Sequence, residues 1–155
     1  MTNGTKVKKR SGSLETLDLN KMHKMVDEAC KDLAGVSASQ IEINSGIQFY
    51  DSITTAEIQE ILIRSASDLI DLENPNYQFV AARLLLFALR KQLWGRMHEC
   101  PSLVEHVHKC IDLNVYDKEI VAKYSDEEWQ TLDAYIDHSR DYLFTYAGLR
   151  QVADK

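Results

Sequence analysis

The sequence has few of the residues that build cross-linked or membrane-embedded proteins. Its 155 residues include only three cysteines, and an odd, widely spaced set of this size does not make a disulfide framework. No stretch reaches the roughly 18 apolar residues in a row that a membrane helix needs. The polar N-terminus also lacks the apolar core of a signal peptide. We therefore expect a reduced, cytoplasmic protein.

Catalytic and metal-binding motifs are missing as well. Gly12 stands alone, without the GxxxxGK[ST] pattern of a phosphate-binding loop, which argues against a catalytic NTPase of that class. Histidines and cysteines do occur together in the middle of the chain, but without CxxC pairs or an HExxH spacing. They are His98, Cys100, His106 and Cys110. We expect no catalytic residue and no metal centre.

What the chain does have is an uneven distribution of charge. The first 24 residues carry a net charge of +4, whereas the whole chain carries −6. The six cations are Lys6, Lys8, Lys9, Arg10, Lys21 and Lys24, against Glu15 and Asp18. A concentrated positive site on a negative body predicts a local anionic ligand rather than a long polyanion such as nucleic acid. The alternative is that these charged residues lie on a solvent-exposed edge strand and protect it from aggregation.

Two short strands of a β-hairpin are predicted at the start of the chain, over residues 6–10 and 14–18. The glycine between them can adopt the positive φ that a tight turn needs. A register with Val7 opposite Leu17 places both apolar side chains on one face. Lys9 then lies opposite Glu15 on that same face. Lys9 is therefore expected to point toward whatever covers the hairpin.

The rest of the chain is predicted to be mainly helical. Apolar periodicity and capping patterns indicate helices over residues 20–33, 37–49, 54–70, 75–94 and 103–113, a short helix after 116–117, and another from 125 onward. A third short strand is expected over 52–54. The helix that begins with Asn74 as N-cap and Pro75 in its first turn is apolar nearly all round, so it should be central and buried. The fold class is mainly α with a small N-terminal sheet (α+β).

Polar residues from four of these elements are expected to meet. Lysine and arginine suit phosphates, and the N-terminus of the third helix offers free N–H groups to an anion. Carboxylates at Glu15 or Asp18 can accept a purine amino group, which a pure phosphate site would not need. The residues are Lys9, Arg10, Glu15, Asp18, Lys21, Thr55, Gln59 and Lys91. Together they predict a site for a nucleoside triphosphate.

Three segments resemble the ATP-cone of ribonucleotide reductase: VKKRSGSLETLDLNKMHKMV, IQFYDSITTAEIQEILIRSASDLI and NPNYQFVAARLLLFALRK. The similarity continues through YDKEIVAKYSDEEWQTLDAYIDHSRDYLFTYAGLRQ, which resembles the large (alpha) subunit of class I enzymes. It covers essentially the whole chain. The resemblance implies an ATP-cone domain over residues 1–95. Residues 96–155 would be a helical segment that leads into a catalytic barrel.

The resemblance also implies a function and partners. ATP or dATP, with Mg²⁺, would bind as an allosteric effector of activity. The partners would be the small radical-bearing beta subunit and further alpha subunits, with no nucleic acid, membrane or redox cofactor involved here. The active-site cysteines belong to the barrel, so this chain alone would not reduce ribonucleotides. It would be a piece of the whole subunit or one part of a split subunit.

The resemblance assigns roles to individual residues. Lys9, Arg10 and Lys91 would hold phosphates, while Glu15 and Asp18 would lie near the adenine. The remaining positions would pack on the base or line the ribose and phosphate side: Leu17, Lys21, Met22, Thr55, Ile58 and Gln59. Bacterial relatives often carry an amide at the position of Asp18 and a histidine at that of Gln59. Asp18 and Gln59 are therefore expected to change the response of this chain to dATP.

Two alternatives from other classes stay open. A DNA-binding regulator that uses the cone as a nucleotide sensor would need a zinc ribbon or another basic reading head, and the C-terminal half is acidic. An interaction module would bind a partner subunit and no nucleotide.

Overall fold

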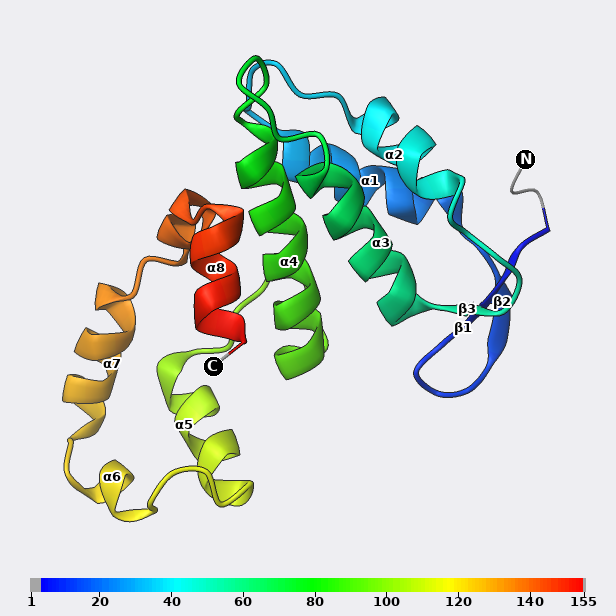
Figure 1. The fold of residues 1–155 in the computed structure, drawn as a ribbon. Coiled ribbons are helices and arrows are strands. Elements are labelled where there is room, and N and C mark those ends of the chain that lie inside the picture. The colour runs from blue at the N-terminus through cyan, green and yellow to red at the C-terminus, as the bar shows by residue number, and fades with distance from the viewer. Residues whose placement is uncertain (1–3, 155) are drawn as a thin grey trace.

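The computed structural model describes residues 4–154. Along the chain, its elements are β1 (Lys6–Lys8), β2 (Leu14–Thr16), α1 (Leu19–Cys30), α2 (Ala38–Gly46), β3 (Ile53–Thr54), α3 (Thr55–Ser67), α4 (Tyr77–Trp94), α5 (Leu103–Asp112), α6 (Glu119–Ala122), α7 (Asp126–Tyr135), the 3₁₀ helix η1 (His138–Leu143) and α8 (Tyr146–Ala153) (Figure 1). One small sheet in a mainly helical protein confirms the predicted α+β class.

The three strands form one sheet in the order β2-β1-β3, with β1 antiparallel to β2 and parallel to β3. The predicted register of the hairpin is wrong, because Val7 pairs with Glu15 rather than with Leu17. The turn closes where the N–H of Lys9 donates to the carbonyl oxygen of Ser13 at 2.9 Å, which sets the pairing two residues away from the prediction. An even shift keeps every side chain on its face. Lys9 and Glu15 consequently still form an ion pair, at 3.2 Å.

The first two helices begin within one residue of their predicted starts, but both are shorter than predicted. α1 ends at Cys30 rather than at residue 33, and Asp32 beyond it has a left-handed φ of 60°. The side chain of Ser37 caps α2, whose predicted range begins at this residue, and α2 ends at Gly46 rather than near residue 49. Met22, Val26 and Ala29 form the buried face of α1.

The junction between β3 and α3 follows its sequence signature closely. Thr54 and Glu57 form a capping box, in which each side chain accepts from the other residue's backbone N–H. The helix ends at Ser67, three residues before the predicted end.

The start of α4 differs from the prediction. The helix begins at Tyr77 rather than at Pro75, and Asn76 holds the N-cap position without a side-chain cap bond. The amide of Asn74 instead donates to the Asp71 carboxylate at 3.2 Å, so it does not cap the helix. Gly95 ends α4 with a left-handed φ of 74°, as predicted.

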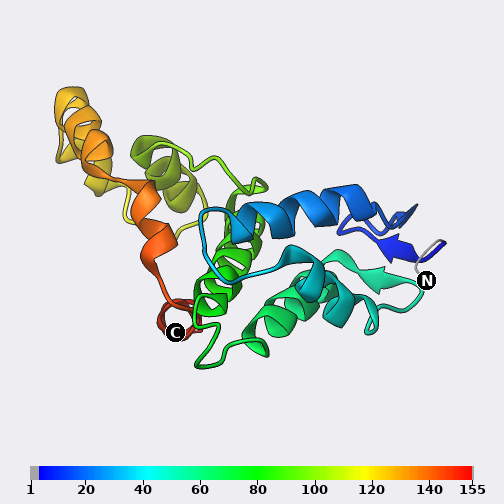
Figure 2. The same cartoon turned by 90° about the horizontal axis from the view of Figure 1, so that it is seen from above.

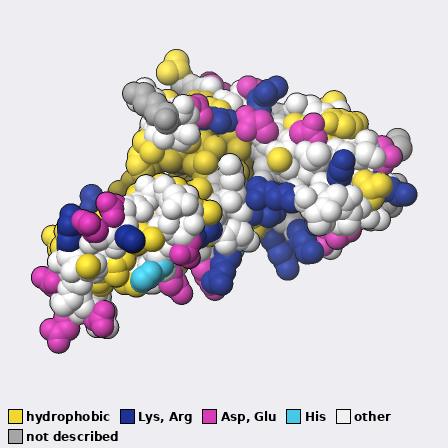
Figure 3. Space-filling model, turned by 90° about the horizontal axis from the view of Figure 1, so that it is seen from below, with side chains coloured by type: hydrophobic (Ala, Val, Ile, Leu, Met, Phe, Trp, Pro, Cys, Tyr) yellow, Lys and Arg dark blue, Asp and Glu magenta, His cyan; other side chains and the backbone are white. Residues whose placement is uncertain are grey.

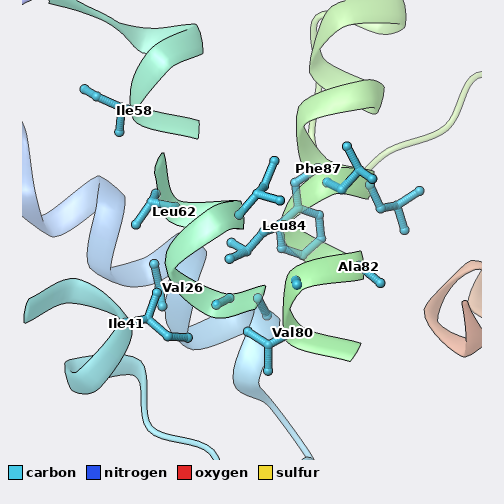
Figure 4. Packing of buried hydrophobic residues seen from close by; sticks show 14 of the residues in the cluster. Val26, Ile41, Ile58, Leu62, Val80, Ala82, Leu84 and Phe87 are labelled. Carbon is cyan, nitrogen blue, oxygen red and sulfur yellow. The ribbon is translucent and has the colours of Figure 1, made fainter. Parts of the chain in front are cut away.

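The core lies around α4, whose central and buried position is confirmed (Figure 4). Val26 of α1, Ile41 of α2, Leu62 of α3 and Phe87 of α4 are fully buried together. The C-terminal elements η1 and α8 return to this core, where Leu149 is buried. The sheet lies at one end of the molecule and α5 to α7 lie at the other (Figure 2). Within residues 4–154, no helix combines the length and the apolar character needed to cross a bilayer.

Candidate functional site

A cavity of about 470 Å³ lies between the hairpin, α1, α3 and the end of α4. This volume falls within the range of small-molecule sites. The structure brings ten of the eleven predicted site residues to its walls: Lys9, Glu15, Leu17, Asp18, Lys21, Met22, Thr55, Ile58, Gln59 and Lys91. Residues separated by more than 80 positions in the chain therefore converge on one space, as the sequence predicts.

Arg10 is the exception. It lines a second, smaller cavity of about 290 Å³ on the side of α3 that faces α8, together with Glu60 and Arg150. Its Nη1 donates to the main-chain carbonyl oxygen of Lys91 at 3.3 Å. Arg10 thus joins the hairpin turn to the last turn of α4 and does not line the main cavity. Gln59 borders both spaces.

The walls of the main cavity carry an excess of positive charge. The ammonium of Lys9 is paired with Glu15 at 3.2 Å, and that of Lys21 with Asp18 at 3.7 Å. Lys91 forms no ion pair with any residue between 4 and 154. Burial lowers the pKa of Lys91, and the nearby charges of Lys9, Arg10 and Lys21 lower it further. An anion in the cavity would relieve this repulsion and stabilise the charged ammonium. Lys and Arg side chains also lie close together near the middle of the face shown in Figure 3.

The cavity has an apolar side as well. Leu17, Met22 and Ile58 contribute to it, and Met22 and Ile58 are buried. Asp18 caps α1, where its Oδ1 accepts from the N–H of Lys21 at 3.1 Å. This carboxylate is therefore fixed in place at the cavity wall. Gln59 is largely buried, with its amide among the wall residues, which gives the site a neutral polar group beside the cations.

Six wall residues were not predicted: Val7, Thr16, Lys24, Met25, Met97 and His98. Helical spacing from Met22 would have found Met25, and strand alternation from Lys9 would have found Val7. Met97 and His98 follow α4 in an irregular connector, where no periodicity indicates direction. Their place is set by the edge-on contact of His98 with Phe87, whose ring centroids are 5.5 Å apart.

The free cysteines of the chain lie apart from this cavity. Burial raises the pKa of the Cys30 thiol to about 11, which makes this side chain unreactive. His106 and Cys110 share one face of α5, with Nε2 and Sγ 3.6 Å apart. Cys100 lies on the connector after α4.

A helical bundle capped by a three-stranded sheet, with a partly apolar and cationic cavity between them, defines a small α+β domain. Residues 5–92 match the family model described as "ATP cone domain". The chain belongs to the ATP-cone family.

Named relatives agree with this assignment. The chain is 44% identical over 149 residues to the ribonucleoside-diphosphate reductase 1 subunit alpha of Escherichia coli (strain K12), a match that covers 96% of this chain and 19% of the relative. It is 42% identical over 155 residues to the ribonucleoside-diphosphate reductase subunit alpha of Haemophilus influenzae, covering 100% and 20% respectively. The subunit alpha of Enterobacteria phage T4 is 40% identical over 149 residues, covering 95% and 19%. The matched segments are N-terminal regions, and this chain spans about a fifth of each relative's length.

Proposed function

We propose that the main cavity binds ATP or dATP, with Mg²⁺, as an allosteric effector. The chain would then be the activity-regulating region of a cytoplasmic ribonucleoside-diphosphate reductase alpha subunit. The observation that carries the proposal is Lys91, a half-buried ammonium without a carboxylate partner among residues 4–154, surrounded by three further cations. Such an arrangement is unfavourable in itself and becomes favourable when a polyphosphate occupies the cavity. The ATP-cone match and the relatives' names support the same ligand.

Different residues of the cavity wall suit the different parts of a nucleotide. The triphosphate would lie between Lys9, Lys21 and Lys91, where it could contact all three ammonium groups. The adenine would pack on the apolar side formed by Leu17, Met22 and Ile58. Glu15 and Asp18 would accept hydrogen bonds from its amino group. Arg10 would act by holding the carbonyl of Lys91 and with it the position of the last α4 turn.

Discrimination between ATP and dATP requires contacts that the 2′-hydroxyl changes, because a ligand shifts an equilibrium only through differential interaction. Thr55 at the start of α3 and Gln59 one turn later are the polar, neutral residues that α3 contributes to the cavity wall. We assign the reading of the ribose to these two side chains. Since Gln59 is neutral at every pH, the distinction would rest on hydrogen bonds alone.

The effect on activity would be a coupling free energy between the bound nucleotide and the quaternary state. That state would involve the small beta subunit and self-association of alpha subunits. The reduction of ribonucleotides would take place in parts of the subunit beyond this chain. The chain therefore contributes regulation rather than chemistry.

Titration calorimetry of the 155-residue chain with ATP and with dATP, each with Mg²⁺, tests the proposal. We expect saturable binding of both nucleotides, with a stoichiometry that gives the number held by the cavity. Absence of heat and of any thermal shift at millimolar nucleotide would contradict it and favour a module that binds only partner subunits. Retardation of DNA in a mobility-shift assay would favour a DNA-binding regulator instead.

A further inference from the structure

A second group of side chains, which does not line the main cavity, combines three kinds of metal-ligating atom. We propose that Cys100, His138 and Asp141 form a binding site for Zn²⁺ or a similar divalent transition-metal ion. The cysteine sulfur, an imidazole nitrogen and a carboxylate oxygen all lie within 4.8 Å of one another. These are the three donor types that zinc takes in proteins, and a mixed S/N/O set favours zinc or cobalt over magnesium or calcium.

The spacing of the donor atoms is close to that of a tetrahedral site. Bonds of 2.0–2.3 Å around tetrahedral zinc separate neighbouring donors by about 3.3–3.8 Å. Nδ1 of His138 lies 3.7 Å from Oδ2 of Asp141. Closing the site on an ion therefore requires side-chain adjustments of about 1 Å, taking the 4.8 Å limit and this tetrahedral spacing together. Water would complete the fourth position.

Both segments that carry the donors are fixed to α4. His138 and Asp141 are three residues apart on the 3₁₀ helix η1, where side chains at this spacing lie in line on one face. Tyr142, next to them, packs edge-on against Phe87 with ring centroids 6.4 Å apart. His98, two residues before Cys100, packs edge-on against the same ring. Contacts with Phe87 therefore fix the two segments of the site relative to each other.

Arg90 is the group that most affects the site. It is buried in α4, and its Nη2 donates to Oδ2 of Asp141 at 2.7 Å. A carboxylate oxygen has two lone-pair sites, so Oδ2 can accept this hydrogen bond and still ligate a metal, and the hydrogen bond orients the carboxylate. The positive charge of Arg90 lowers the affinity for a cation. Thiolate and carboxylate together neutralise a divalent ion, so the assembled site has no uncompensated charge beyond that of Arg90.

Access and protonation are both compatible with binding. His138 is exposed and Asp141 partly so, which leaves an entry path for an ion. Coordination by Cys100 exchanges the proton of its thiol for the metal–sulfur bond and releases that proton to solvent.

Titration of the reduced 155-residue chain with Co²⁺, after removal of metal by chelation, tests the site. We expect one equivalent to give the charge-transfer absorption of a cobalt–thiolate bond. Cys100→Ser abolishes that absorption, and His138→Gln weakens binding at least tenfold. Cys110→Ser is the matched control, because Cys110 lies beside His106 without a carboxylate and should leave the titration unchanged. The proposal is overturned if no cobalt–thiolate absorption appears. It is also overturned if that absorption is lost in Cys110→Ser and kept in Cys100→Ser.

A measurement on the unaltered chain does not depend on whether the variants fold. Zn²⁺ should slow the alkylation of Cys100 by iodoacetamide at least tenfold, read peptide by peptide by mass spectrometry, while Cys110 reacts as before. Equal rates for Cys100 with and without Zn²⁺ overturn the proposal. Neither experiment uses a nucleotide, so the outcome is independent of the function proposed for the cavity.

Discussion

Arg10 and Lys91 are joined by a hydrogen bond of 3.3 Å from the guanidinium Nη1 of Arg10 to the main-chain carbonyl oxygen of Lys91. The bond links the hairpin turn to the last turn of α4, 81 positions along the chain. Both elements contribute lysines to the walls of the main cavity, Lys9 from the hairpin and Lys91 from α4, and the bond ties the two elements together. It also brings a second cation beside the Lys91 ammonium, which contributes to the lowered pKa of that group.

Removing the Lys91 ammonium is expected to weaken nucleotide binding. Lys91→Ala or Lys9→Ala should cost about 1.5–3 kcal/mol of binding free energy, the range for a charged hydrogen bond, measured by titration calorimetry with ATP. Lys118→Ala is the control, because this exposed lysine lies next to α6 at the far end of the molecule and should bind as the unaltered chain does (Figure 1). Unchanged affinity in both cavity variants would refute the phosphate contacts.

The same residue should lower the stability of the nucleotide-free protein. Because the pKa of Lys91 is lowered on folding, the unfolded chain binds its proton more tightly, and the charged group opposes folding at all pH values below its folded pKa. This penalty is relieved as the pH rises toward 10.5, the ordinary value. Lys91→Met should therefore raise the free energy of unfolding at pH 7 by about 0.5 kcal/mol, the scale of partly exposed charges. Denaturant titration of both proteins would show it, and a loss of stability would contradict the repulsion.

Most of the cavity could be predicted because its residues belong to regular elements. Strand alternation directs Lys9 and Leu17 to one face, and the capping box fixes the start of α3 near Thr55. The register of the hairpin could not be predicted, because two registers that differ by an even number of residues bury the same side chains. The turn decided between them, through a backbone hydrogen bond that hydrophobic patterning does not encode.

The positions of the connector after α4 and of α8 could not be predicted from the sequence for a different reason. Met97 and His98 enter the cavity from an irregular connector, and their direction depends on contact with Phe87. The return of α8 to α4 likewise depends on packing between segments more than 50 positions apart, which includes the Arg90–Asp141 ion pair. The division at residue 95 into an ATP-cone domain and a helical segment stays a prediction.

The contact between α1 and α2 should depend on pH through His23. Its Nδ1 lies 2.8 Å from the Glu42 carboxylate, and this hydrogen bond and charge raise the pKa of His23 above its ordinary 6.5. A raised pKa adds stability that is complete below 6.5 and is lost as the pH rises through the folded value. In Glu42→Gln, NMR titration should find the pKa of His23 back near its ordinary value. An unchanged pKa in that variant would show that Glu42 is not its partner in solution.

The ion pair between Arg90 and Asp141 should matter more to stability than an exposed pair does. Asp141→Asn leaves the buried guanidinium without its counter-charge and should cost about 2–3 kcal/mol, less than the 3–5 kcal/mol of a fully buried pair because Asp141 is partly exposed. Glu60→Gln removes the charge that faces Arg150, in a pair whose two side chains are both more exposed, and should cost about 1 kcal/mol or less. Denaturant titrations with chelator present compare the two. Equal losses would mean that burial of Arg90 contributes nothing.

Substitution of Leu149 tests whether α8 shares the core of the helical bundle. Its side chain is buried among the core residues, whereas Val152, one turn later on the same helix, is 65% exposed. Leu149→Ala should cost about 2–5 kcal/mol, the usual range for a buried leucine, and Val152→Ala less than about 0.5 kcal/mol. A single cooperative transition that moves to lower denaturant in Leu149→Ala, seen both by circular dichroism and by Trp94 and Trp129 fluorescence, would mean that residues 138–154 unfold together with the bundle. If Leu149→Ala instead split the transition or left its midpoint unchanged, α8 would be attached to the bundle without sharing its core.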